Sequence, residues 1–117
     1  MPLFTVLAAA AAQAASPSAQ EQDLHCIAVI SAIIGKADEN KRAAVTPLVM
    51  YYVGRVAGRD PTLKLEPELR RVYANQAAFQ KTFPAEAARC GAEMDIVGKD
   101  LVRMGEALKQ SETGGPK

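Results

Sequence analysis

The stretch LHCIAVISAII, from Leu24 to Ile34, decides the fold class of this chain of 117 residues. Wound into a helix, it is apolar almost all the way round instead of along one stripe. A helix of that kind is normally central and buried. We therefore expect a helix over residues 19–36, with the rest of the chain packed around it.

Proline and glycine residues divide the remaining sequence into further helices. Thr46 and Pro47 predict an N-cap followed by proline at the first helical position, where the missing N–H does no harm. That helix is predicted to stop at Gly58, and Pro67 and Pro84 are predicted to open two more. We find no strand alternation, so the expected fold is all-α, a compact bundle of about four helices. The expected bounds of the last three helices are 47–57, 67–80 and 84–110.

The last predicted helix carries the clearest apolar pattern. Its seam recurs at spacings of four, three, four, three and four residues: Cys90, Met94, Val97, Leu101, Met104 and Leu108. Such a seam is typical of helices that pack on other helices. Beside it, Gly91, Gly98 and Gly105 recur every seven residues, and each costs a helix about 1 kcal/mol relative to alanine. The glycines therefore predict a close approach by another backbone, with a ligand as the alternative.

The segment YYVGRVAGR, residues 51–59, combines structural residues with candidate binding residues. Gly54 and Gly58 are one turn apart and are predicted to offer a flat strip to the glycines of the last helix. Tyr51, Arg55 and Arg59 remain on the outer edge as candidate ligand-binding residues, because clustered arginines bind carboxylate or phosphate. The alternative is a solvated face with weak ion pairs. The predicted buried stripe of this helix is Val45, Val49, Tyr52, Val53 and Val56.

The first residues read as an export signal. The apolar run 3–12 is too short to span a bilayer, which takes about 20 residues, and a small-x-small pattern follows it. Residues 1–14 are predicted to be a signal peptide, cleaved between Ala14 and Ala15 or between Ala15 and Ser16. The alternative is an alanine-rich leader on a cytosolic protein. With the signal removed, we expect a periplasmic or secreted protein with no membrane insertion.

Removing that signal leaves 117 − 14 = 103 residues, enough for one domain. We expect a single helical domain over 15–110 and a disordered tail over 111–117. The only two cysteines, Cys26 and Cys90, have a single possible intramolecular pairing, which an oxidising compartment favours. The predicted disulfide joins the first and last helices, and two buried thiols are the alternative.

Charge and composition argue against several functions. Fourteen basic and thirteen acidic side chains give a net charge of +1, and only 5% of residues are aromatic, so nucleic-acid binding is not expected. The single histidine, His25, is adjacent to Cys26, but neighbouring helical residues do not face each other. No clustered metal ligands or phosphate loop are found in the sequence. We therefore expect no enzyme activity, no metal and no cofactor.

Some of these residues resemble a known arrangement. A cysteine in an early apolar helix, the aromatic-x-Gly step from Tyr52 to Gly54, a proline-bearing turn and a late cysteine resemble the HdeA-like periplasmic helical family. That family includes acid-stress chaperones and the Rap/Tai-type immunity proteins, and the likeness covers 24–108. The resemblance implies a non-catalytic protein that binds a protein partner or client. An uncharacterised lineage-specific family is the alternative.

A second hypothesis is a small-ligand carrier. It predicts a cavity of several hundred Å³, on the order of those that hold small molecules, between the glycine face and the second helix. Tyr51, Tyr52, Arg55 or Arg59 would lie at its mouth.

Overall fold

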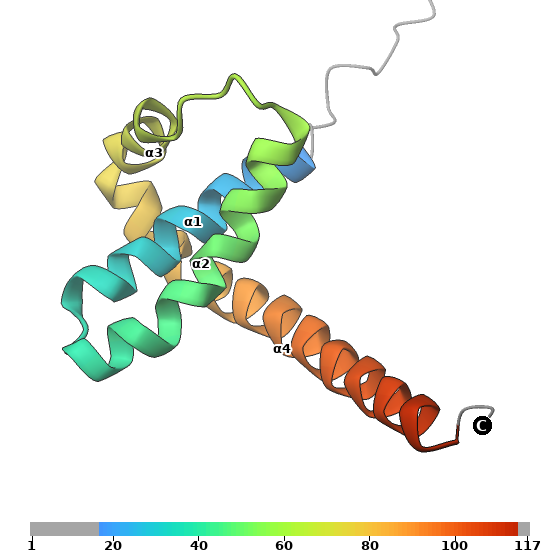
Figure 1. The fold of residues 1–117 in the computed structure, drawn as a ribbon. Coiled ribbons are helices and arrows are strands. Elements are labelled where there is room, and N and C mark those ends of the chain that lie inside the picture. The colour runs from blue at the N-terminus through green and yellow to red at the C-terminus, as the bar shows by residue number, and fades with distance from the viewer. Residues whose placement is uncertain (1–16, 115–117) are drawn as a thin grey trace, which may run out of the picture.

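The computed structural model describes residues 17–114 of the chain, and four α-helices make up most of that part (Figure 1). They are α1 (Ala19–Lys36), α2 (Glu39–Arg59), α3 (Leu65–Ala74) and α4 (Gln76–Gly114). The predicted all-α bundle is confirmed. The predicted signal peptide, 1–14, and its cleavage sites lie outside the described residues.

The first helix has the predicted bounds and lies at the centre of the bundle. Ser18 caps its N-terminus, because the Ser18 hydroxyl accepts a hydrogen bond from the Glu21 N–H at 3.1 Å. Only Ala37 and Asp38 separate α1 from α2, so the two helices run side by side in opposite directions (Figure 1). They form the main helix pair of the fold.

The second helix begins at Glu39, well before the predicted start at Pro47. Asp38 provides the cap, since its carboxylate accepts a hydrogen bond from the Lys41 N–H at 2.8 Å. Pro47 lies inside the helix, where a proline removes one backbone hydrogen bond. The helix also passes through Gly58, the predicted stop, and ends at Arg59. The helix therefore starts at the Asp38 cap and continues through Pro47, although a proline alone indicates a helix start.

The break between α3 and α4 is also displaced from its predicted place. It falls at Asn75, whose side-chain oxygen accepts a hydrogen bond from the Ala78 N–H at 3.1 Å. Pro84, predicted to open the last helix, lies inside α4. The helix continues to Gly114, so the first part of the predicted disordered tail is helical. The remainder of that tail, 115–117, is outside the described residues.

The core lies between α1 and α2, and α4 closes it at one side. Most of the predicted stripe of α2 is confirmed: three of its residues are buried, and Val45 and Val53 pack partly buried against them. Leu69 and Val72 of α3 also pack on this cluster. The buried core cluster comprises Leu24, Cys26, Ile27, Ile30, Val49, Tyr52, Val56 and Cys90.

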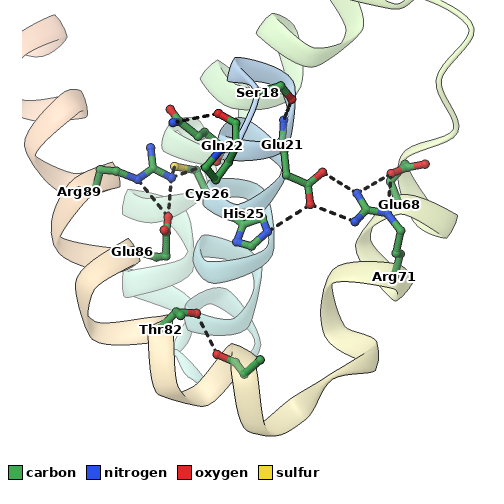
Figure 2. Close-up of polar contacts among 12 residues, drawn as sticks. Ser18, Glu21, Gln22, His25, Cys26, Glu68, Arg71, Thr82, Glu86 and Arg89 are labelled. Atoms are coloured by element: carbon green, nitrogen blue, oxygen red, sulfur yellow. Dashed lines mark hydrogen bonds and ion pairs between the residues drawn. The ribbon is translucent and has the colours of Figure 1, made fainter. Parts of the chain in front are cut away.

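The predicted disulfide is confirmed. Cys26 and Cys90 are bonded with their Cα atoms 5.7 Å apart, which links α1 to α4. Arg89 covers the bond: its Nη2 lies 3.4 Å from the Cys26 sulfur and donates to the Gln22 carbonyl at 3.1 Å (Figure 2).

The second half of α4 leaves the bundle. Figure 1 shows this orange-to-red segment running away from the other helices toward the C-terminus. From Gly98 to Glu112, every residue is exposed. We call residues 96–112 the distal segment of α4. The predicted seam therefore packs against the core at Cys90 and Met94, whereas Leu101, Met104 and Leu108 are exposed.

Candidate functional site

The candidate binding residues of α2 lie together on one side of the helix. Arg55 Nη1 donates a hydrogen bond to the Tyr51 hydroxyl at 3.0 Å, and the guanidinium carbon is 5.4 Å from the centre of the Tyr51 ring. The side chains of Arg55 and Arg59 are 34% and 35% exposed, so about two thirds of each is covered. The two side chains are therefore not the freely solvated face that was the alternative to a ligand site.

A buried carboxylate, Asp23 of α1, explains their position. Asp23 is only 1% exposed, and its Oδ2 lies 2.7 Å from Arg59 Nη1 and 3.1 Å from Arg55 Nε. Neither contact is a well-directed hydrogen bond, so Oδ2 is held by the two positive charges. A carboxylate removed from water requires such compensation. The two arginines thus hold Asp23 within the fold.

Glu93 of α4 extends this cluster. Arg55 also forms an ion pair with Glu93, so the two carboxylates together compensate the two guanidinium groups. The Gln20 side chain adds a contact, accepting a hydrogen bond from Arg59 Nη1 at 2.9 Å. An anionic ligand would have to displace these carboxylates. We therefore assign the cluster of Asp23, Arg55, Arg59 and Glu93 a structural role.

Sequence reasoning missed Asp23, although a signal was present. Asp23 precedes the apolar stretch directly, and Cys26 and Ile27 follow it at three and four residues. That spacing places the carboxylate on the same helix face as two core residues. A lone charge on a buried face predicts an opposite charge from another element.

Tyr52 joins α2 to α4 beside the disulfide. Its side chain is fully buried, and its hydroxyl donates a hydrogen bond to the Cys90 carbonyl at 2.9 Å. Burial raises the pKa of Tyr52 well above its ordinary value, and the negative charge of Glu93 raises the pKa further. Burial also raises the pKa of Tyr73. Both hydroxyls therefore stay protonated in the folded protein when a free tyrosine ionises.

These shifts predict instability in alkali. A raised folded-state pKa contributes stability below the unfolded tyrosine pKa of 10.0, and that contribution is lost as the pH rises further. We expect the free energy of unfolding to fall above about pH 10, and Tyr52→Phe to fall less steeply. Urea titrations at several pH values, with tyrosinate absorbance followed in parallel, measure both. Ionisation of all three tyrosines near pH 10.0 while the helices remain intact would contradict this account.

His25 belongs to a separate ion-pair cluster between α1 and α3. Its Nε2 lies 3.3 Å from Glu21 Oε1, and Arg71 donates two hydrogen bonds to Glu21 at 2.9 and 2.7 Å (Figure 2). Arg71 also binds Glu68. Hydrogen bonding from Arg71 holds the pKa of Glu21 below its ordinary value. Since the Cys26 sulfur is in the disulfide, the adjacent imidazole has no thiolate to activate.

The predicted glycine contacts are wrong. A side-chain carbon built at Gly54, Gly58, Gly91, Gly98 or Gly105 would meet nothing within 4 Å beyond its chain neighbours and the nearby backbone of its own helix. The glycines of α2 and α4 therefore do not bring the two helices together. All five glycines are exposed, and Gly98 and Gly105 lie where α4 extends past the bundle.

The distal segment of α4 exposes large apolar side chains. In the seam, Leu101, Met104 and Leu108 are 60%, 49% and 68% exposed. Ile96 and Val102 are exposed on other sides of the same helix. Gly98 and Gly105 lie next to the seam with open space above them. A second helix could therefore pack closely on this strip.

A larger and a smaller hollow also lie on the surface of the described residues. The larger, about 640 Å³, lies between the end of α1, the start of α2 and the junction of α3 with α4, and is open to solvent on one side. The smaller lies along α4 at Met94 and Gly98. Neither is lined by Tyr51, Tyr52, Arg55 or Arg59, so the mouth predicted for a carrier pocket does not coincide with either hollow.

No cluster of three or more metal-binding side chains occurs within residues 17–114. In the same part of the chain, none of the helices has the length and apolar character needed to cross a bilayer.

Comparison of the chain with protein-family models, with characterised proteins and with solved structures finds no match. The resemblance to the HdeA-like family therefore stays a prediction.

Proposed function

We propose that this chain is a small exported protein that acts by binding another protein and has no catalytic activity of its own. The observation that carries the proposal is the distal segment of α4, where Leu101, Met104 and Leu108 are exposed on the part of the helix that extends beyond the bundle (Figure 1). Contiguous exposed apolar side chains usually mark sites of interaction.

The form of this surface favours a helical partner. The seam keeps the four-three spacing of a coiled coil, and Gly98 and Gly105 leave room for a close backbone. The side of the helix away from the seam carries oppositely charged pairs, including Lys99 with Asp95 at 2.9 Å and Arg103 with Asp100 at 3.2 Å. With its apolar seam on one side and charged pairs on the other, the distal segment is amphipathic, so the partner surface would be an apolar stripe or groove.

Export is supported by two features. The leader has the pattern of a signal peptide, and the Cys26–Cys90 bond is of a kind that persists in oxidising compartments. A chaperone-like role and an inhibitor-like or immunity role both require such a binding surface. They differ in whether the partner is many unfolded clients or one folded protein.

A matched pair of substitutions tests the binding surface. Leu101→Glu places a charge in the seam, and Ile96→Glu places the same charge about 140° around the helix. The two side chains are equally exposed, at 60% and 62%, so both variants should fold alike. We expect Leu101→Glu to reduce binding about tenfold and Ile96→Glu to leave it near the wild-type level.

Binding is measured in two assays with the purified mature protein. The first is suppression of aggregation of an acid-sensitive test protein, and the second is crosslinking followed by intact-mass analysis. Suppression that depends on Leu101 supports the chaperone version, and one stoichiometric adduct supports the inhibitor version. The proposal would fail if both variants matched the wild type in both assays.

A further inference from the structure

The larger cavity is a candidate binding site that the proposed function does not use. Its volume of about 640 Å³ falls within the range of roughly 300–1,000 Å³ that is usual for small-molecule sites. Ile33 of α1, Lys41 of α2, Tyr73 of α3 and Phe79 of α4 all line it, so four elements meet there. It is remote in sequence from the distal segment of α4.

Three aromatic rings form one wall of the cavity. Tyr73 and Phe79 have ring centroids 4.6 Å apart, and Phe79 and Phe83 have centroids 5.7 Å apart. The Tyr73 hydroxyl donates a hydrogen bond to the Ala28 carbonyl at 2.6 Å, which fixes the ring on α1. That bond occupies the polar end of Tyr73, so the wall is apolar. Half of the six aromatic residues of the chain are gathered here.

Two lysines are the charged residues of the lining. Lys36 is at the end of α1 and Lys41 is in the first turn of α2, so they approach the cavity from different helices. Among the described contacts, neither ammonium group has an ion pair or a hydrogen bond. The nearby Asp38 carboxylate is engaged as the cap of α2. An apolar wall with two lysines beside it that form no ion pair is complementary to an anion with an apolar body.

We propose that this cavity binds a small amphipathic monocarboxylate. The apolar body of the ligand lies against Tyr73, Phe79 and Phe83, and its carboxylate accepts hydrogen bonds from Lys36 and Lys41. Charge-assisted hydrogen bonds of this kind are stronger than neutral ones, so the head group as well as the apolar body determines affinity.

The test uses dodecanoate, below its micelle concentration, as the probe. Titration of the mature protein, followed by calorimetry and by amide chemical shifts, is expected to show one saturable site with shifts at the cavity. Dodecanol, which lacks the charge, and dodecyltrimethylammonium, which reverses it, should bind at least about tenfold more weakly. Equal binding of the alcohol and the carboxylate would overturn the proposal, and so would binding to anionic lipid vesicles without binding to free dodecanoate.

Matched variants locate the site. Lys36→Gln/Lys41→Gln is expected to weaken dodecanoate binding about tenfold or more, whereas Lys64→Gln/Lys81→Gln removes the same charge outside the lining and should change it less than about twofold. Ala32→Leu fills part of the cavity and should also weaken binding. Leu101→Glu should bind dodecanoate normally, which separates this site from the seam of α4. If the Lys36/Lys41 and Lys64/Lys81 double variants weakened dodecanoate binding equally, the assignment of the cavity as the binding site would be wrong.

Discussion

Replacing Cys26 and Cys90 together by alanine is expected to lower the free energy of unfolding by about 4 kcal/mol. The bond joins positions 64 residues apart, and the loss of chain entropy in the unfolded state grows with the length of the closed loop. A domain of this kind has a total stability of about 5–15 kcal/mol, so the bond accounts for a large share of it. Urea unfolding of the wild type and the double variant measures the difference.

Reduction of the wild type provides the control. The reduced protein keeps both sulfur atoms in the core and loses only the covalent link, so its stability should be close to that of the double variant. If the reduced and oxidised proteins unfold at the same urea concentration, the core alone holds α1 against α4. In that case the disulfide does not contribute to the folding stability of the protein.

Replacing Arg55 and Arg59 by glutamine is expected to destabilise the fold by about 3–5 kcal/mol, because it leaves the Asp23 carboxylate buried without compensation. Asp23→Asn should cost less, about 1–2 kcal/mol, since it removes the buried charge and the arginines can turn toward water. The triple variant, with all three changes, is therefore expected to be more stable than the double arginine variant.

Exposed arginines offer a matched control for this experiment. Arg70 and Arg103 pair with Glu66 and Asp100 on the surface, and their side chains are 78% and 76% exposed. Their double replacement by glutamine changes the net charge equally and should cost under about 1 kcal/mol per pair. The account of Asp23 would be wrong if this control were as unstable as the Arg55 and Arg59 variant, or if Asp23→Asn gave no rescue.

The sequence predicted correctly those parts of the fold where the capping residue and the apolar pattern indicate the same structure. Helix α1 combines a serine cap with an all-round apolar stretch, so both its bounds and its burial could be read directly. The disulfide followed from the cysteine count. The helix boundaries predicted at Pro47 and Pro84 were wrong. A proline removes only one hydrogen bond, and the surrounding turns of α2 and α4 continue past it.

The candidate site was harder to predict, because the role of its residues depends on contacts with side chains from helices distant in the sequence. Tyr51, Arg55 and Arg59 were correctly grouped, but Asp23 and Glu93 come from α1 and α4, and they turn a possible ligand site into a structural cluster. The seam of α4 packs as predicted only at Cys90 and Met94, because spacing alone does not show where a partner helix ends. The cavity at the α3–α4 junction depends on the break at Asn75, which the sequence placed elsewhere.

The position of the disulfide also determines how a mechanical load would pass through the protein. Cys90 lies in α4 just before the distal segment, and its bond leads directly into α1. A partner that pulled on the distal segment would therefore transmit force along one helix to a covalent bond. Helices α2 and α3 lie within the loop that this bond closes and are outside the path of the force.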